Sequence, residues 1–221
     1  MSVRVKICGV KESRHIPCLL QQPAAAYVGL VFYPRSPRFV SVSQASALID
    51  AMPASLKKVG VVVDGDDHVL HHIISHVALD FLQCHGEESC ARIATIKSTF
   101  AIKVIKAIKV RCADDIKKAG PFQSVADMLL FDAAAPHSLA LPGGSGRAFE
   151  WTWLDNFRSA CPWFLSGGLD ADNLSVAVRT SGATHVDVSS GVERAPGEKD
   201  SSKIRSFLDN AALITQETQP C

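Results

Sequence analysis

Short apolar runs alternate along the chain with longer stretches in which hydrophobic residues recur every three or four positions. The runs predict buried strands, and the longer stretches predict amphipathic helices. Eight runs occur, at residues 3–9, 27–33, 57–64, 81–86, 101–110, 128–133, 163–168 and 185–191. Eight helix-like stretches alternate with them, the last at 201–213. This order predicts an α/β protein, a single (β/α)8 TIM barrel of eight parallel strands. The alternative is an open, doubly wound sheet.

The first run, VRVKICG, has two different faces. Alternation places Val5 and Ile7 on one face and Lys6 and Cys8 on the other. A polar face that ends in a thiol is unusual for simple packing. We expect this face to look into the barrel, with Cys8 at its mouth.

Nothing in the sequence divides the chain into separate domains, because no linker or shift in composition interrupts the pattern. Residues 1–214 are therefore predicted to form the barrel, and the polar tail 215–221 is expected to fray. The connection 133–151, after the sixth apolar run, is longer than the others. Loops of this length in a compact barrel are often lids or ligand-binding loops.

Composition excludes several classes of function. The net charge is +1, from 23 basic and 22 acidic residues, which argues against binding to nucleic acid or to an anionic membrane. No apolar run is long enough to span a bilayer, so a cytoplasmic protein is expected, although a transit peptide removed on entry to an organelle would leave no trace. The seven cysteines contain no C-x-x-C pair and are interpreted as reduced thiols.

Polar residues follow the carboxyl ends of the predicted strands, where the active sites of such barrels lie. These residues are Cys8, Arg35, Arg38, His85 and Asp132, together with the small-residue turns 166–168 and 187–191. Turns after the seventh and eighth strands often bind phosphate through backbone N–H groups. Glycine permits close approach, and serine adds hydroxyl donors. Asp170 or Asp172 is expected to cap the helix that follows the first turn.

Several motifs in order resemble one enzyme family. They are KICG, GLVFYPRSPR, VGVVVD, HGEE, FDA, GGSGRAFEW, LSGGL and VDVSSGVERAPGEKD. The chain resembles the phosphoribosylanthranilate isomerases of tryptophan biosynthesis from its first strand to its last helix. The resemblance implies a (β/α)8 barrel that catalyses an Amadori rearrangement without cofactor or metal. The implied substrate is a phosphorylated aminosugar, N-(5-phosphoribosyl)anthranilate, and the product is 1-(2-carboxyphenylamino)-1-deoxyribulose 5-phosphate.

The resemblance also implies roles for individual residues. Cys8 corresponds to the general base, Asp132 to the general acid, and Arg38 to the group that binds the anthranilate carboxylate. His85 corresponds to a histidine at the rim of the site, and Asp187 to a residue near the ribose hydroxyls. The phosphate would be held by Gly167, Gly168, Ser189 and Ser190. The chain departs from the family pattern at Phe131 and Cys84, and the segment 133–141 matches it loosely.

Lys6 suggests how Cys8 could act as a base. A free cysteine, with a pKa of about 8.5, is mostly protonated at neutral pH. Lys6 lies two residues earlier on the same face, about 6.6 Å away along the strand. At that distance its charge would lower the thiol pKa by up to ~2 units. The alternative is that Lys6 is a structural charge in a barrel layer.

Other constellations are interpreted as structural. His72 and His76 have helical spacing, but the apolar residues Val69, Leu70, Ile73, Ile74 and Val77 define the buried stripe of that helix and leave the histidines toward solvent. The segment Gly143–Gly146 lacks the context of a dinucleotide site. Lys106 would suit a Schiff-base enzyme, which the acid/base pair disfavours.

Two other functions remain as rivals. One is an aldose–ketose isomerase of histidine biosynthesis, which is expected to carry a carboxylate where Cys8 stands. The other is a barrel that binds a phosphorylated ligand without catalysis. The sequence leaves a monomer and a homodimer both open.

Overall fold

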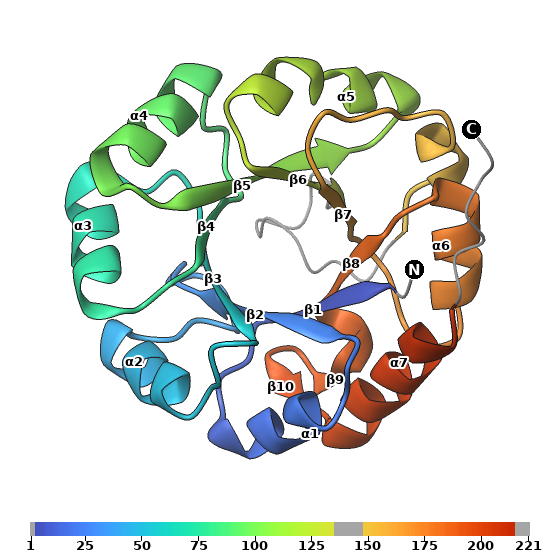
Figure 1. Cartoon of the computed structure of the whole chain (residues 1–221), viewed down its shortest axis with the longest axis horizontal. Coiled ribbons are helices and arrows are strands. Elements are labelled where there is room, and N and C mark those ends of the chain that lie inside the picture. The colour runs from blue at the N-terminus through green and yellow to red at the C-terminus, as the bar shows by residue number, and fades with distance from the viewer. Residues whose placement is uncertain (1–2, 135–147, 215–221) are drawn as a thin grey trace.

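In the computed structural model, which describes residues 3–134 and 148–214, eight parallel strands close into a barrel surrounded by helices (Figure 1). The strands are β1 (Arg4–Cys8), β2 (Ala25–Val31), β3 (Lys57–Val62), β4 (Phe81–Cys84), β5 (Lys103–Val110), β6 (Met128–Ala133), β7 (Trp163–Leu165) and β8 (His185–Val188). Strand β1 pairs with β2 on one side and with β8 on the other, where Lys6 lies opposite Asp187. This closure confirms the predicted barrel and excludes the open sheet.

The helices in the described residues are α1 (Ile16–Leu20), α2 (Val42–Asp50), α3 (Asp67–His76), α4 (Cys90–Phe100), α5 (Ala113–Lys117), α6 (Leu174–Ser181) and α7 (Ser201–Leu213). Local signals set several of their ends. Ser41 and Gln44 form a reciprocal capping box at the start of α2. Ser89 caps α4, and Asp200 accepts two backbone N–H groups at the start of α7. Helix α6 ends at Gly182 in the left-handed conformation.

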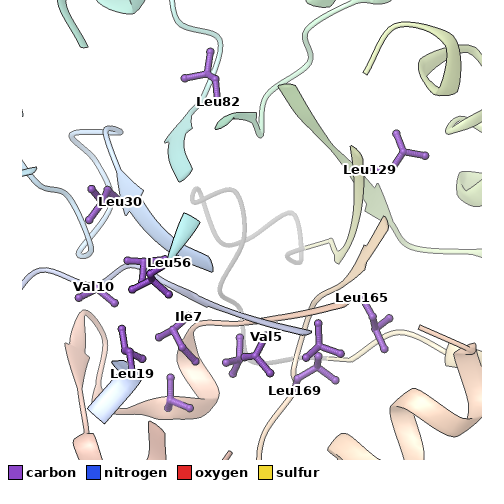
Figure 2. Packing of buried hydrophobic residues seen from close by; sticks show 14 of the residues in the cluster. Val5, Ile7, Val10, Leu19, Leu30, Leu56, Leu82, Leu129, Leu165 and Leu169 are labelled. Carbon is purple, nitrogen blue, oxygen red and sulfur yellow. The ribbon is translucent and has the colours of Figure 1, made fainter. Parts of the chain in front are cut away.

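The hydrophobic core lies mainly between the strands and the helices. Val5 and Ile7 point from β1 toward the surrounding helices, and Leu82, Leu129 and Leu165 do the same from other strands (Figure 2). A second cluster fills the inside of the barrel and includes the aromatic side chains of Tyr27, Phe81 and Phe164. The two predicted faces of the first strand are thus confirmed, because its apolar side chains face the helices and Lys6 is fully buried on the inner side.

The structure differs from the sequence prediction in three places. In residues 148–162, the described part of the sixth helix-like stretch, the chain forms a 3-10 turn, Trp151–Leu154, whose aromatic residues pack against the core. A two-stranded hairpin, β9 (Glu193–Ala195) and β10 (Glu198–Lys199), which was not predicted, lies between β8 and α7. On α3, Val69 is 41% exposed and is not part of the buried stripe.

Some predictions fall on residues that the structure does not describe. These are most of the long loop 133–151, with the segment Gly143–Gly146, and the tail 215–221. In the described part of the chain, no helix is long and apolar enough to cross a membrane.

Candidate active site

A cavity opens at the carboxyl ends of the barrel strands, and we call it the central cavity. All nine predicted site residues line it: Cys8, Arg38, His85, Asp132, Gly167, Gly168, Asp187, Ser189 and Ser190. They come from six different strands or from the loops that follow them. The barrel therefore brings together residues that are up to about 180 positions apart in the sequence, as the parallel arrangement predicts.

Cys8 lies at the end of β1, above the buried Lys6. The Lys6 ammonium donates to Asp187 Oδ1 at 2.9 Å, and Ser166 Oγ donates to Asp187 Oδ2 at 3.1 Å. Gly29 of β2 makes room for this arrangement, because a Cβ there would approach Cys8 Sγ to 2.8 Å. Asp187 therefore belongs to the wall beneath the thiol as well as to the cavity.

Burial dominates the ionisation of this thiol. It raises the pKa of Cys8 above the ordinary value, while the Lys6 ammonium lowers it and the Asp187 carboxylate raises it further. The expected effect of Lys6 therefore has the predicted sign. The net pKa of Cys8 is nevertheless raised in the free protein, because loss of water around the sulfur outweighs the neighbouring charge.

Asp132, at the carboxyl end of β6, is 4% exposed and contacts His85, which is in turn held by Gln83. His85 Nε2 lies 3.2 Å from Asp132 Oδ2, and Gln83 Nε2 lies 2.8 Å from the other ring nitrogen, Nδ1. Gln83 was missed from sequence. A signal was present, because alternation in β4 places this polar residue on the same face as His85. Gln83 Oε1 is buried and has no hydrogen-bond partner within the described residues.

Arg38 is held in the wall of the cavity by a carboxylate that was also missed. Its Nε and Nη2 donate to Glu193 Oε1 and Oε2, both at 2.8 Å. Lys199 donates to Glu193 Oε1 at 2.7 Å. Both residues lie in the motif VDVSSGVERAPGEKD, which carried the resemblance without indicating this contact.

The two small-residue turns meet beside the cavity. Gly167 and Gly168 have φ values of +91° and +65°, a conformation that favours glycine. A Cβ on Gly167 would lie 2.5 Å from the backbone nitrogen of Ala133, and one on Gly191 would overlap the carbonyl oxygen of Leu169. These glycines therefore permit close packing of the backbone in both turns.

The side chains of Ser189 and Asp170 have hydrogen-bond partners within the protein. Ser189 Oγ donates to the carbonyl oxygen of Cys8 at 3.1 Å and accepts from Lys199 Nζ, so its proton is directed away from a ligand. Asp170 Oδ1 accepts the N–H groups of Asp172 and Asn173, which caps the turn before α6 rather than the helix itself.

The other candidates of the sequence lie away from the cavity. Lys106 Nζ donates to Gly86 O and to Glu88 Oε2, both at 2.7 Å, on the outside of the barrel. This placement argues against a Schiff-base lysine. His72 and His76 are exposed, as predicted, and their rings are 4.9 Å apart. The described residues contain no group of three side chains suited to holding a metal ion.

Comparison with known proteins extends over nearly the whole chain. Residues 5–210 match the family model described as N-(5'phosphoribosyl)anthranilate (PRA) isomerase. The N-(5'-phosphoribosyl)anthranilate isomerase of Rhodospirillum centenum is 46% identical over 215 residues, which cover 97% of this chain and 100% of the relative.

Solved structures of this enzyme are also similar. One is a phosphoribosyl anthranilate isomerase in complex with reduced 1-(o-carboxyphenylamino)-1-deoxyribulose 5-phosphate. It is 33% identical, with a TM-score of 0.79, and covers 95% of this chain and 98% of its own. Another, described as monomers of the dimeric enzyme from Thermotoga maritima, is 34% identical, with a TM-score of 0.78, and covers 96% and 100% of the two chains.

The barrel, the cavity and the comparisons lead to the same assignment. Cys8 and Asp132 line one cavity, as the resemblance implied, and each relative described above carries the same enzyme name. The chain belongs to the N-(5'-phosphoribosyl)anthranilate isomerase family and is an aldose–ketose isomerase of tryptophan biosynthesis.

Proposed function

We propose that Cys8 and Asp132 are the general base and the general acid of the Amadori rearrangement that this family catalyses. The observation that carries the proposal is their shared cavity. Strands β1 and β6 lie on opposite parts of the ring (Figure 1), and both side chains line the space between them. A substrate bound there would have a thiol on one side and a carboxyl group on the other.

The proposed reaction begins with opening of the furanose ring. Asp132 donates a proton to the ring oxygen as the bond from C1′ to that oxygen breaks, and an iminium ion forms between C1′ and the anthranilate nitrogen. The Cys8 thiolate then removes the proton on C2′, which the iminium has acidified, and the electron pair forms an enolamine. Tautomerisation of the enolamine gives the ketone. The His85 N–H, 3.2 Å from Asp132, would stabilise the carboxylate left after the first step.

The ends of the substrate would be bound on opposite sides of the reacting carbons. Arg38 suits the anthranilate carboxylate, because Glu193 occupies its Nε and one Nη2 proton and the remaining guanidinium protons are available. Backbone N–H groups of the turns at Gly168 and Ser190 suit the phosphate. Asp187 would accept a hydrogen bond from a ribose hydroxyl through Oδ2, which also accepts from Ser166 Oγ, because Oδ1 is paired with the Lys6 ammonium.

Single substitutions test these roles. Cys8→Ala and Asp132→Asn should each lower kcat by at least about a thousandfold, measured by the change in anthranilate-adduct fluorescence. Both variants should still bind the product, because neither substitution touches the carboxylate or phosphate subsites. Turnover near the wild-type rate in either variant would reject its assignment. A wild-type protein that binds product without turnover would support the non-catalytic rival.

The small-molecule partner follows from this reaction and is a phosphorylated aminosugar. We propose that the protein works in the cytoplasm, which is supported by the free thiols of all six cysteines in the described residues. The two oligomeric states predicted from the sequence are a monomer and a homodimer. Light scattering behind a sizing column would distinguish them.

A further inference from the structure

The hairpin formed by β9 and β10 carries a carboxylate with an unusual number of donors. The Glu193 side chain is 3% exposed. Its Oε1 accepts from Arg38 Nε and Lys199 Nζ, and its Oε2 accepts from Arg38 Nη2 at 2.8 Å and from the backbone N–H of Gly197 at 3.2 Å. Four donors on one buried carboxylate satisfy its charge, and these contacts lower the pKa of Glu193 against the opposing effect of burial.

One side of Glu193 determines where Arg38 points. The bidentate contact holds the guanidinium plane at two nitrogens, which leaves the Nη1 protons and one Nη2 proton for a ligand. No hydrogen bond to Nη1 occurs within residues 3–134 and 148–214. These remaining N–H groups are on the guanidinium of Arg38, a residue that lines the central cavity. Arg38 is therefore oriented before a ligand arrives.

The other side of Glu193 reaches the second small-residue turn through Lys199. The Lys199 side chain is 1% exposed, and its Nζ donates to Glu193, to Ser189 O at 2.9 Å and to Ser189 Oγ at 3.2 Å. Burial lowers the pKa of Lys199, and the Glu193 carboxylate counteracts that effect. Without Glu193, the ammonium that holds Ser189 would be buried without a carboxylate partner.

Backbone packing fixes the hairpin against the loop that carries Arg38. Gly197 has a φ of +81°, and a Cβ there would overlap the carbonyl oxygen of Pro37. Gly9, with a φ of +80°, passes so close to the arginine stem that a Cβ would lie 2.7 Å from Arg38 Cδ. The hairpin and the loop can therefore shift little relative to each other. The Glu193 carboxylate is in this way kept within hydrogen-bond distance of the Arg38 guanidinium.

We propose that Glu193 is a positioning residue for both ends of the substrate. Through Arg38 it orients the donors for the ring carboxylate, and through Lys199 it supports the turn that receives the phosphate. This inference rests on the proposed function for the contacts that Arg38 and the turn make with the ligand. It adds that one carboxylate, which touches neither end of the ligand, sets the affinity for both.

The test compares variants of this hairpin by steady-state kinetics. Glu193→Gln keeps the shape of the side chain and removes its charge. Glu198→Gln, in the same hairpin, breaks only the exposed pair with Arg194 and serves as the control. We expect Glu193→Gln to raise KM roughly tenfold to a hundredfold while kcat stays within about threefold. Glu198→Gln should match the wild type, since exposed pairs contribute little.

Inhibition by three probes separates the two ends. The probes are inorganic phosphate, the product 1-(2-carboxyphenylamino)-1-deoxyribulose 5-phosphate, and the same compound without its ring carboxyl group. In Glu193→Gln, the preference for the carboxylated compound should fall roughly tenfold, and the inhibition constant of phosphate should rise. Lys199→Met should weaken phosphate inhibition and leave the carboxyl preference unchanged. This second variant keeps the proposal testable if Glu193→Gln does not fold.

Arg38→Met distinguishes failure of the positioning role of Glu193 from failure of the proposed role of Arg38. If Arg38→Met loses the carboxyl preference but Glu193→Gln keeps it, the positioning role is wrong and the proposed function stands. If Arg38→Met also keeps the preference, the assignment of Arg38 fails, and the inference for that end fails with it. A Glu193→Gln variant that loses kcat at unchanged KM would likewise overturn the inference, because the residue would then act on the chemical step. Recovery of affinity in Glu193→Asp would support the requirement for a charge.

Discussion

His85 Nε2 lies 3.2 Å from Asp132 Oδ2, and both side chains are buried at the mouth of the barrel. The amide nitrogen of Gln83 lies 2.8 Å from His85 Nδ1. An amide N–H can only donate, so Nδ1 must accept, and the ring proton must be on Nε2. In this arrangement the histidine presents an N–H to the carboxylate that proton donation leaves on Asp132. Gln83 thus selects the tautomer.

Replacing Gln83 with leucine should remove the hydrogen bond that fixes the tautomer of His85. We expect the Gln83→Leu variant to lose roughly tenfold in kcat with little change in KM, because one buried hydrogen bond supports the orientation of the acid. Nitrogen-15 NMR should report protonation at Nε2 of His85 in the wild type and a mixture of tautomers in the variant. A wild-type ring protonated at Nδ1 would instead mean that the amide carbonyl faces the histidine.

Removing Lys6 should make the catalytic thiol harder to ionise. The Lys6 ammonium lowers the pKa of Cys8, so in Lys6→Met the midpoint of Cys8 alkylation should move to higher pH. The rate of reaction with iodoacetamide at neutral pH should fall accordingly. Lys6→Met also leaves Asp187 as an unpaired buried charge, so Lys6→Met/Asp187→Asn is the matched control for stability. An unchanged midpoint in the single variant would show that Lys6 is only a structural charge.

His185 should make the barrel less stable in mild acid. Burial, with a smaller effect from the Arg4 charge, lowers the pKa of His185 from 6.5 to about 4. Between pH 4 and pH 6.5 the unfolded chain binds more protons at this histidine than the folded chain does. The contribution of neutral His185 to the free energy of unfolding is therefore fully present above pH 6.5 and is lost as the pH falls toward 4. The loss should be about 1–2 kcal/mol, allowing for solvent screening of a partly exposed ring.

Urea denaturation at several pH values would measure this effect. His185→Phe cannot ionise and keeps an aromatic ring beside Phe164, whose centroid is 5.3 Å away. Its stability should therefore decrease less between pH 6.5 and 4 than that of the wild type. Equal slopes for the two proteins would assign the acid sensitivity to other groups.

Gly167→Ala should lower the free energy of unfolding by more than the cost of its left-handed backbone conformation alone. A left-handed alanine costs about 1–2 kcal/mol, and here the Cβ would also lie 2.5 Å from Ala133 N. Gly182→Ala is the control, since its φ is +71° and a Cβ would meet nothing within 4 Å. We expect both to lower the free energy of unfolding, Gly167→Ala by more. A raised KM is expected only for Gly167→Ala, and its absence would place this turn away from the phosphate.

The sequence was sufficient for the barrel and for the residues around its mouth. Strand and helix periodicities are local, so they could be read without knowing any distant contact. Once the strands were ordered in parallel, Cys8, His85 and Asp132 had to meet at one end, because side chains after successive strands share an edge. The same logic placed Gly167 and Ser189 beside them.

Only the tertiary structure showed which partner each of these groups has. The contact of Arg38 with Glu193 joins residues 155 positions apart, and that of Lys6 with Asp187 joins residues 181 positions apart. Such pairs leave no periodic signal, since either carboxylate could equally have faced water. The pKa of Cys8 likewise depends on how completely the fold removes water from the thiol, a property of the packed barrel that two neighbouring residues in a strand do not reveal.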